Sequence, residues 1–438
     1  MKITFMGAGS TVFAKNVLGD TLLTPALAED LEIALYDIDG DRLEESYLVI
    51  DLINKKYNGG KAKIGKYLGV ENRKSALRGS RFVVNAIQVG LYDPCTIIDF
   101  EIPKKYGLRQ TIADTLGIGG IFRGLRTIHV LEGFARDMEE VCPDALFLNY
   151  TNPMAILSGY IQRYTGVKTV GLCHSVQWCS HSLLKTLGRQ DIEVGSELIA
   201  GINHMAWLLD IRDKQGKDLY PELRALAKEK NKEQHSNMIR LDYIDKFGYY
   251  CTESSEHNAE YNPFYIKSKY PELIDRWNIP LDEYPRRCVN QIAGWQKQKE
   301  TILNGGDIEH KRSSEYASRI MEAIITNKPY EIGGNVLNTG LIDNLPSDAC
   351  VEVPCHVNGH GVIPCHVGRL PVQCAAMNMT NINPQLLTIE AAVTKKREHI
   401  YQAAMLDPHT AAELSIDDII KMCDELFEAH TSAGYPIF

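Results

Sequence analysis

The 438-residue sequence has no long hydrophobic run and no block of basic residues. No apolar stretch reaches the ~18 residues that a membrane-spanning helix needs, so we expect no membrane segment. A net charge of −9 at pH 7, without a Lys/Arg-rich run, argues against nucleic acid as a partner. The first predicted strand begins at Lys2, which leaves no room for a signal peptide, and we therefore expect a cytoplasmic protein.

Cys-x-x-Cys pairs are also absent, although the chain holds eleven cysteines. An odd number of cysteines in a long chain favours reduced thiols over a disulfide framework. Two Cys-His pairs, at residues 355–356 and 365–366, flank His360. A structural zinc site and a simple loop between short strands are both open for this segment.

The first half of the chain alternates strand-like and helical segments, which is typical of a parallel sheet. We predict an α/β protein with an N-terminal Rossmann-like, doubly wound parallel sheet over residues 1–200. Strands are expected at 2–6, 32–36, 82–87, 145–148, 168–172 and near 197–201, and helices at 11–23, 40–57, 123–140 and 153–164.

The second half, residues 201–438, has a different pattern, and its start falls somewhere within 195–210. Two helices are expected at about 286–303 and 313–326, followed by a segment rich in Gly, Pro, Cys and His at 333–371. Further helices reach residue 430. We predict a mixed α+β domain that closes over the active site.

The N-terminal segment KITFMGAGS predicts a buried strand that runs into a glycine turn. Gly7, Gly9 and Ser10 would approach a pyrophosphate, but Val12 stands where the third glycine of the dinucleotide fingerprint belongs. Asp37 ends the second strand, 28 residues after Gly9. A carboxylate there accepts the ribose hydroxyls of NAD and repels a 2′-phosphate. The alternative is a strand–turn–helix unit that binds no phosphate.

Polar residues follow several predicted strands, at the edge where a doubly wound sheet binds ligands. Asn85 and Gln88 follow the third strand, and we expect them to face the cofactor. Asn152 belongs to a loop that orients nicotinamide and sugar, or else it caps a helix. Cys173 and His204 follow two further strands and could hold a divalent metal, although their spacing alone is a poor metal motif.

Motifs along the whole chain resemble glycoside hydrolase family 4, the NAD- and metal-dependent glycosidases. Besides the glycine turn, they are DTLGIGGIFRGLR (114–126), NYTNP (149–153), GLCHSVQ (171–177), GINHMAW (201–207) and NTGLIDNLPSDACVEVP (338–354). The CHSVQ segment and FGYYCTESSEHNAEYNPF (247–264) most resemble the α-galactosidase (melibiase) branch.

The resemblance implies a redox-assisted elimination in place of the usual two-carboxylate hydrolysis. NAD⁺ would take hydride from C3 of the sugar, and the resulting ketone would acidify the proton at C2. A divalent metal such as Mn²⁺ on the C2 and C3 oxygens would stabilise the enediolate. Elimination at C1, addition of water and return of hydride to C3 would complete the cycle.

The resemblance also implies roles for individual residues. The metal ligands are Cys173 and His204. His174 is in the position of the acid, and the base is a tyrosine, either Tyr249 or Tyr250. The cofactor-binding residues are Gly7, Gly9, Ser10, Asp37 and Asn85, and the substrate-binding residues are Asn152, Asp114 and Arg287.

The substrate follows from an absence. Family members that act on phosphorylated sugars grip the phosphate with an arginine shortly after the third strand, and residues 88–93 contain none. We therefore expect an unphosphorylated hexoside. The resemblance to the α-galactosidase branch implies an α-galactoside of the melibiose or raffinose type, with an α-glucoside or an α-galacturonide as alternatives. The resemblance further implies a homo-oligomer, a dimer or a tetramer.

Two other classes of protein remain open. An NAD-dependent 2-hydroxy-acid dehydrogenase shares this fold and could use Arg123, Arg126 and His204 for its substrate. An NAD-sensing protein would bind NAD and a sugar without turnover.

Overall fold

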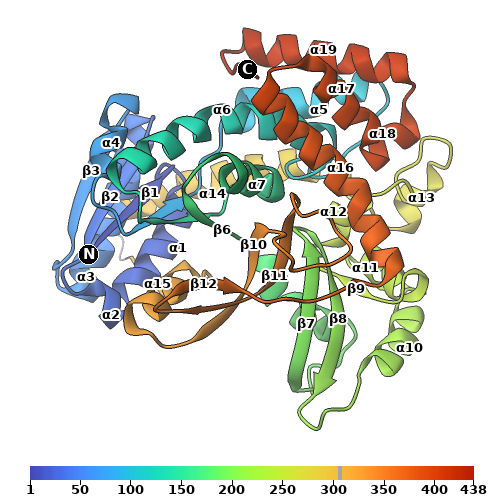
Figure 1. Ribbon diagram of the computed structural model, residues 1–438, viewed down its shortest axis with the longest axis horizontal. Coiled ribbons are helices and arrows are strands. Elements are labelled where there is room, and N and C mark those ends of the chain that lie inside the picture. The colour runs from blue at the N-terminus through green and yellow to red at the C-terminus, as the bar shows by residue number, and fades with distance from the viewer. Residues whose placement is uncertain (304–307) are drawn as a thin grey trace.

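Six parallel strands form the first half of one large sheet in the computed structural model, which describes residues 1–303 and 308–438 (Figure 1). The spatial order follows the Rossmann pattern. It is β3 (Lys63–Leu68), β2 (Glu32–Asp37), β1 (Lys2–Met6), β4 (Phe82–Asn85), β5 (Leu146–Asn149) and β6 (Lys168–Leu172). The predicted doubly wound fold is confirmed.

Helices cover both faces of this parallel half. Alternate residues of a strand face opposite sides of the sheet. Ile3 and Phe5 accordingly pack in one core with α1 (Thr11–Leu22) and α3 (Gly40–Asn58), whereas Met6 packs in a second core with α6 and α7. The bounds of these last two helices are Gly117–Val141 and Met154–Tyr164.

The sheet continues past β6 into antiparallel strands from the second half of the chain. Their order is β10 (Tyr330–Leu337), β11 (Cys350–Asn358), β7 (Val194–Ile202), β8 (Met205–Asp213) and β9 (Tyr250–Cys251), while β12 (Gly361–Pro364) pairs with β11. One sheet thus joins the two predicted domains, and the boundary predicted near residue 200 falls within β7.

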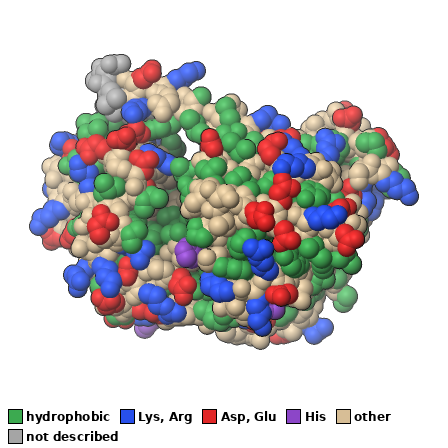
Figure 2. Space-filling view, turned by 90° about the horizontal axis from the view of Figure 1, so that it is seen from above, with side chains coloured by type: hydrophobic (Ala, Val, Ile, Leu, Met, Phe, Trp, Pro, Cys, Tyr) green, Lys and Arg blue, Asp and Glu red, His purple; other side chains and the backbone are tan. Residues whose placement is uncertain are grey.

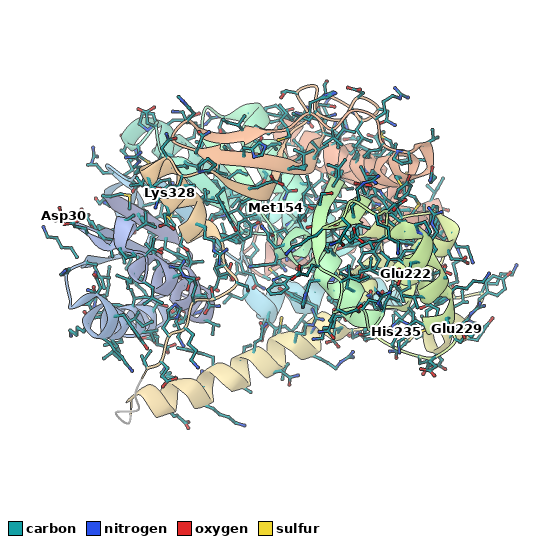
Figure 3. All side chains as sticks on the ribbon, turned by 90° about the horizontal axis from the view of Figure 1, so that it is seen from below. Asp30, Met154, Glu222, Glu229, His235 and Lys328 are labelled. Carbon is teal, nitrogen blue, oxygen red and sulfur yellow. The ribbon has the colours of Figure 1, made fainter. Side chains whose placement is uncertain are left out.

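The remaining helices lie around this sheet. They are α2 (Pro25–Ala28), α4 (Arg73–Leu77), α5 (Ile97–Lys105), α8 (His174–Gln177), α9 (Cys179–Thr186), α10 (Tyr220–Lys230), α11 (Met238–Lys246), α12 (Ser255–Ala259), α13 (Glu272–Arg276), α14 (Glu283–Leu303), α15 (Ala317–Thr326), α16 (Val372–Thr394), α17 (Arg397–Leu406), α18 (Pro408–Glu413) and α19 (Ile416–Ser432). The long α14 runs along one side of the molecule (Figure 3), and Trp295 Nε1 donates to Glu45 Oε2 of α3 at 2.7 Å.

Figure 2 shows basic side chains interspersed with acidic ones, without a large basic patch on that face. Among the described helices, none has the length and apolar character needed to span a bilayer.

Candidate functional site

The N-terminal glycine turn lets other backbone come very close. Gly7 has a φ of +82°, and a Cβ there would lie 2.9 Å from the backbone of Ala86, so a larger residue would force a shift. The amides of Gly7 and Ala8 donate to the Tyr36 carbonyl at 3.0 and 2.9 Å. α1 begins directly after Ser10, and the N–H groups at a helix N-terminus attract phosphate.

Asp37, at the carboxyl end of β2, holds the same turn in place. Its Oδ2 accepts from the Gly9 amide at 2.6 Å, and its Oδ1 accepts from the amides of Ile38 and Asp39 at 2.8 and 3.0 Å. Arg42 donates to the Gly9 carbonyl through Nε and Nη2. A carboxylate offers about four acceptor positions, so one is left for a ribose hydroxyl.

A cavity of about 810 Å³ lies over this turn, within the size range of ligand sites. The predicted cofactor residues Gly7, Ser10 and Asp37 line it. Ile38 and Val70, which are 74% and 61% exposed, form part of its apolar wall. A polar end beside an apolar wall suits a nucleoside, whose sugar is polar and whose base is flat.

Buried amides continue along the sheet edge from this cavity. Asn85 Nδ2 donates to Asn149 Oδ1 at 2.9 Å and to Thr151 Oγ1 at 3.1 Å. The Oδ1 atoms of Asn85 and Asn152 are buried and have no hydrogen-bond partner among the described residues. An unsatisfied buried acceptor costs about 1–3 kcal/mol, which favours a ligand that donates hydrogen bonds at these two positions.

Three side chains form a candidate metal centre farther along the same edge. Cys173 directly follows β6, His204 lies in the turn between β7 and β8, and Glu253 follows β9. Their ligand atoms all lie within 4.8 Å of one another, and His204 Nε2 is 3.3 Å from Glu253 Oε2. One thiol, one imidazole and one carboxylate make a mixed donor set that suits a first-row divalent cation.

The charges around this cluster favour a cation. Burial alone would raise the pKa of Glu253, but His204 and His257 lower it to about 2, so its carboxylate is ionised at neutral pH. Burial, together with Glu352 and Glu253, raises the pKa of the Cys173 thiol well above its ordinary value. A bound divalent cation would therefore displace a proton from this thiol.

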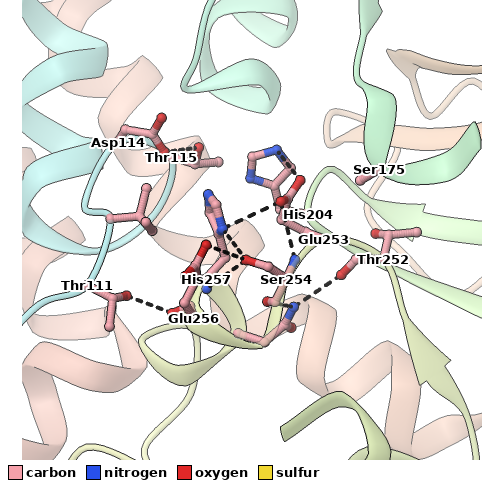
Figure 4. A network of polar contacts seen from close by, with 12 residues as sticks. Thr111, Asp114, Thr115, Ser175, His204, Thr252, Glu253, Ser254, Glu256 and His257 are labelled. Atoms are coloured by element: carbon pink, nitrogen blue, oxygen red, sulfur yellow. Dashed lines mark hydrogen bonds and ion pairs between the residues drawn. The ribbon is translucent and has the colours of Figure 1, made fainter. Parts of the chain in front are cut away.

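A layer of polar side chains surrounds the cluster (Figure 4). His204 Nδ1 lies 3.2 Å from the Tyr261 hydroxyl, and such a partner fixes the ring of a metal-binding histidine. His257 Nδ1 lies 2.7 Å from Ser254 Oγ and 3.5 Å from Glu253 Oε1. The predicted substrate residue Asp114 lies on the far side of His257 and accepts from Thr115 at 2.7 Å.

His174 adjoins the cluster through Cys173. Its Nε2 is 2.7 Å from Glu315 Oε2, and its ring packs near Tyr150 and Tyr316. Burial would lower the pKa of His174, but the Glu315 carboxylate outweighs burial and raises it. The Glu315 carboxylate therefore favours the protonated form of this imidazole.

The two predicted base tyrosines are engaged elsewhere. The Tyr250 hydroxyl accepts from Asn237 Nδ2 at 2.7 Å, and burial raises the pKa of this phenol to about 12. Tyr249 packs edge-on against Tyr220. Neither is hydrogen-bonded to or stacked against Cys173 or His204, so the structure does not bring these two tyrosines into the cluster.

Arg287, a predicted substrate residue, lies on α14 and forms ion pairs with Glu256 and Glu283. Glu256 belongs to α12, as does His257. The structure therefore places Arg287 at the edge of the polar layer, with its guanidinium committed to two carboxylates.

Glu253, His257 and Tyr261 were not singled out from the sequence. All three lie within the segment 247–264, which was recognised only as a mark of the galactosidase branch. The signal that could have found them is the density of acidic, histidine and tyrosine residues there. The Cys/His segment 355–366, for which a zinc site was one possibility, belongs to the β11–β12 hairpin. Among the described residues, only Cys173, His204 and Glu253 bring three possible metal-ligand atoms close together.

The fold and the site define a dinucleotide-binding type of α/β protein with a candidate metal centre at the sheet edge. The model of the "Family 4 glycosyl hydrolase" family matches residues 2–189, and that of the "Family 4 glycosyl hydrolase C-terminal domain" matches residues 199–410. The chain belongs to family 4 of the glycosyl hydrolases and is therefore an enzyme of this class.

Relatives extend over nearly the whole chain. The alpha-galactosidase of Bacillus subtilis (strain 168) is 62% identical over 429 residues, which cover 98% of each chain. The alpha-galactosidase of Rhizobium meliloti (strain 1021) is 34% identical, covering 98% of this chain and 88% of that protein. The 6-phospho-beta glucosidase from Thermotoga maritima, solved with manganese, NAD⁺ and glucose-6-phosphate, has a TM-score of 0.78 at 20% identity, covering 100% and 99% of the two chains. This last likeness shows the fold alone.

Proposed function

We propose that this glycosidase is an NAD- and divalent-metal-dependent α-galactosidase for unphosphorylated substrates of the melibiose and raffinose type. The observation that carries the proposal is the grouping of Cys173, His204 and Glu253 on the sheet edge that also carries the glycine turn. The 62% identity to a protein named alpha-galactosidase supports the choice of sugar. The NAD⁺ and manganese of the Thermotoga structure support the cofactors.

Bound NAD⁺ would supply a hydride acceptor for C3 of the sugar, and a divalent cation, which we propose is Mn²⁺, would supply a Lewis acid for the oxygens on C2 and C3. Gly7, Gly9 and Ser10 would hold the phosphates, and Asp37 the adenosine ribose. The metal-binding residues would be Cys173, His204 and Glu253. The open acceptor atoms of Asn85 and Asn152 would orient the nicotinamide and the sugar between these two regions.

We assign the base that removes the C2 proton to Tyr261. Its hydroxyl contacts His204 on the side of the ring away from Glu253. Burial, with Asp114 and Glu260 nearby, raises the pKa of this phenol well above its ordinary value. A bound cation would therefore act on this phenol through the His204 ring, whose Nδ1 faces the hydroxyl while Nε2 faces Glu253. Because Tyr249 and Tyr250 have other partners, Tyr261 takes the role expected for one of them.

His174 is our candidate for the acid that protonates the leaving oxygen at C1. Glu315 would keep its imidazole protonated and aimed, as in other acid–carboxylate pairs. Asp114 would bind sugar hydroxyls, since its carboxylate lies beside His257. Arg287 would act through Glu256 rather than by direct contact with the sugar.

The loop after β4 supports an unphosphorylated sugar. Arg126 approaches this loop and donates to the Val89 carbonyl at 3.2 Å, but its guanidinium is bidentate to the buried Asp99 carboxylate. An arginine whose guanidinium is already paired with a carboxylate is a poor ligand for a phosphate, because the N–H groups that would bind the phosphate are occupied.

The test is hydrolysis of p-nitrophenyl α-galactoside with and without NAD⁺ and Mn²⁺, under reducing conditions. We expect turnover that needs both additions and accumulates no NADH. The α-glucoside, its 6-phosphate and the α-galacturonide serve as matched comparisons. Faster turnover of one of these would mean that this glycoside, and not the α-galactoside, is the substrate. NADH accumulation with a hydroxy acid, without cleavage of any glycoside, would contradict the proposal.

Two further expectations remain proposals. We propose a reducing, cytoplasmic location, because all eleven cysteines are unpaired and one of them would bind the metal. We also propose a homo-oligomer, on the resemblance to the family.

A further inference from the structure

We propose that Tyr435, near the end of the chain, forms part of the binding site for the adenine ring of the dinucleotide. This inference rests on the proposed use of NAD. Gly434, Tyr435 and Pro436 line the same cavity as Gly7 and Asp37, although they come from the opposite end of the sequence. The cavity is therefore closed by a segment that no dinucleotide fingerprint contains.

The end of α19 fixes the backbone of Tyr435. Gly434 has a φ of +87°, its amide donates to the Thr431 carbonyl at 3.0 Å, and the Tyr435 amide donates to the His430 carbonyl at 2.9 Å. These two bonds form a Schellman motif, in which a left-handed glycine ends a helix and turns the chain. Tyr435 thus leaves α19 in a defined direction, toward the cavity.

Contacts on both sides of Tyr435 tie it to the cavity wall. His430 Nε2 lies 2.8 Å from Asp99 Oδ1, and Asp99 forms the buried ion pair with Arg126. Arg126 itself lines the cavity. On the other side, Ile437 is 1% exposed and packs in the core that contains α6. The backbone of Tyr435 is therefore held between two buried neighbours, so less conformational entropy is lost when a ligand binds.

The chemistry of the neighbouring wall fits an adenine ring. Ile38, Val70 and Leu91 line the cavity and are exposed to solvent, and Asp37 lines it as well. Apolar and aromatic side chains bind a base by contact with its flat face. Tyr435, which is half-buried, adds an aromatic ring to the lining of the cavity that also holds the carboxylate assigned to the ribose.

The experiment measures binding by titration calorimetry with NAD⁺, ADP-ribose and nicotinamide mononucleotide. We expect Tyr435→Ala to weaken ADP-ribose and NAD⁺ by about tenfold, in line with the loss of one base–aromatic stack. Binding of nicotinamide mononucleotide, which lacks adenine, should not change. Tyr435→Phe, which keeps the ring, should bind ADP-ribose as the wild type does.

Phe438→Ala is the matched control, because Phe438 packs against Phe427 at 5.6 Å between ring centroids and does not line the cavity. We expect it to bind ADP-ribose normally. Wild-type binding of NAD⁺ with an equally tight Tyr435→Ala variant would overturn this inference alone. Equal weakening in Tyr435→Ala and Phe438→Ala would also overturn it, since tail order would then account for the effect. A wild-type protein that binds no NAD⁺ would instead overturn the proposed function.

Discussion

The cavity over the glycine turn takes most of its polar ligand-binding groups from residues 7–42, whereas the metal cluster takes one residue each from three distant segments. In the cavity, Gly7 and Gly9 lie in the turn after β1, and their amides donate to Tyr36 and Asp37 at the end of the neighbouring parallel strand β2. In the cluster, Cys173, His204 and Glu253 lie close together only because strands from distant parts of the chain form one sheet. A local motif builds the first region, and the tertiary fold builds the second.

Backbone conformation sharpens this difference. The cavity uses a glycine where φ is positive, which costs little. His204 and Glu253 have φ values of +63° and +65° without being glycine. Such conformations cost about 1–3 kcal/mol each and persist where the surrounding structure enforces them. The cluster should therefore depend on the surrounding fold more than the cavity does.

The largest expected effect is a loss of activity on removing a metal ligand, which should leave the NAD⁺ cavity unchanged. Cys173→Ser should lower the rate of glycoside hydrolysis by about 10³-fold, because a lost metal ligand removes several kcal/mol of charge stabilisation. Calorimetry should show loss of Mn²⁺ binding with unchanged NAD⁺ affinity. Cys365→Ser, at another partly exposed free thiol, is the control and should behave as the wild type. Full activity of metal-stripped Cys173→Ser would contradict the metal assignment.

The next effect concerns stability. Asp99→Asn should lower the free energy of unfolding by about 3 kcal/mol, since it leaves the buried Arg126 charge without its partner. Urea titration at pH 7 measures the change. Asp144→Asn, at an exposed surface pair with Lys168, should cause no measurable change. An Asp99→Asn protein as stable as the wild type would mean that the ion pair contributes nothing.

The Asp99→Asn variant also tests how the free energy of unfolding depends on pH. Burial would raise the pKa of Asp99, but Arg126 and His430 outweigh it and lower the pKa below its ordinary value. The stabilisation from the Asp99 carboxylate is therefore complete above about pH 4 and is lost as the pH falls through the lower pKa of the folded protein. Asp99→Asn should show a shallower acid-induced loss of stability, and an unchanged slope would contradict this account.

Glu253→Gln should weaken Mn²⁺ binding by about 100-fold, because a neutral amide replaces an ionised ligand. Titration calorimetry with MnCl₂ measures the affinity. Glu256→Gln is the matched control, since that carboxylate pairs with Arg287. If both variants bound Mn²⁺ equally well, Glu253 would not be a ligand.

The smallest effect comes from the other region. Asp37→Ala should weaken NAD⁺ by about tenfold, through loss of charged hydrogen bonds to the glycine turn and the ribose. Its Mn²⁺ affinity should stay at the wild-type value. A parallel loss of metal affinity would show that the two regions are coupled rather than separate.

The same contrast explains what could be predicted from the sequence. The glycine turn, Asp37 and the first five predicted strands follow from local pattern. The five strands correspond to β1, β2, β4, β5 and β6, the turn directly follows β1, and Asp37 ends β2. β3 was missed because Lys63–Leu68 is a sheet-edge strand with charged, exposed residues. α6 begins at Gly117, earlier than predicted, because its glycines weaken the helical signal; a Cβ on Gly119 would lie 2.4 Å from the Ala113 carbonyl oxygen.

Contacts between distant segments were beyond local patterns. Cys173 and His204 were found through motifs, but Glu253 and Tyr261 join them only through the pairing of β8 with β9 and the path of the chain after it. Tyr261, which contacts His204, lies eleven residues after Tyr250, and motif alignment alone did not single it out.

The position of β10 has a consequence for dividing this protein. β6 pairs with β5 on one side and, through Gly171 and Leu172, with Asn335 and Gly334 of β10 on the other. A fragment cut near residue 200 would leave one flank of β6 with unpaired backbone groups, and such an open edge recruits other strands. The Rossmann-like half should then self-associate in solution when expressed alone, and co-expression of the other half should restore the missing strand.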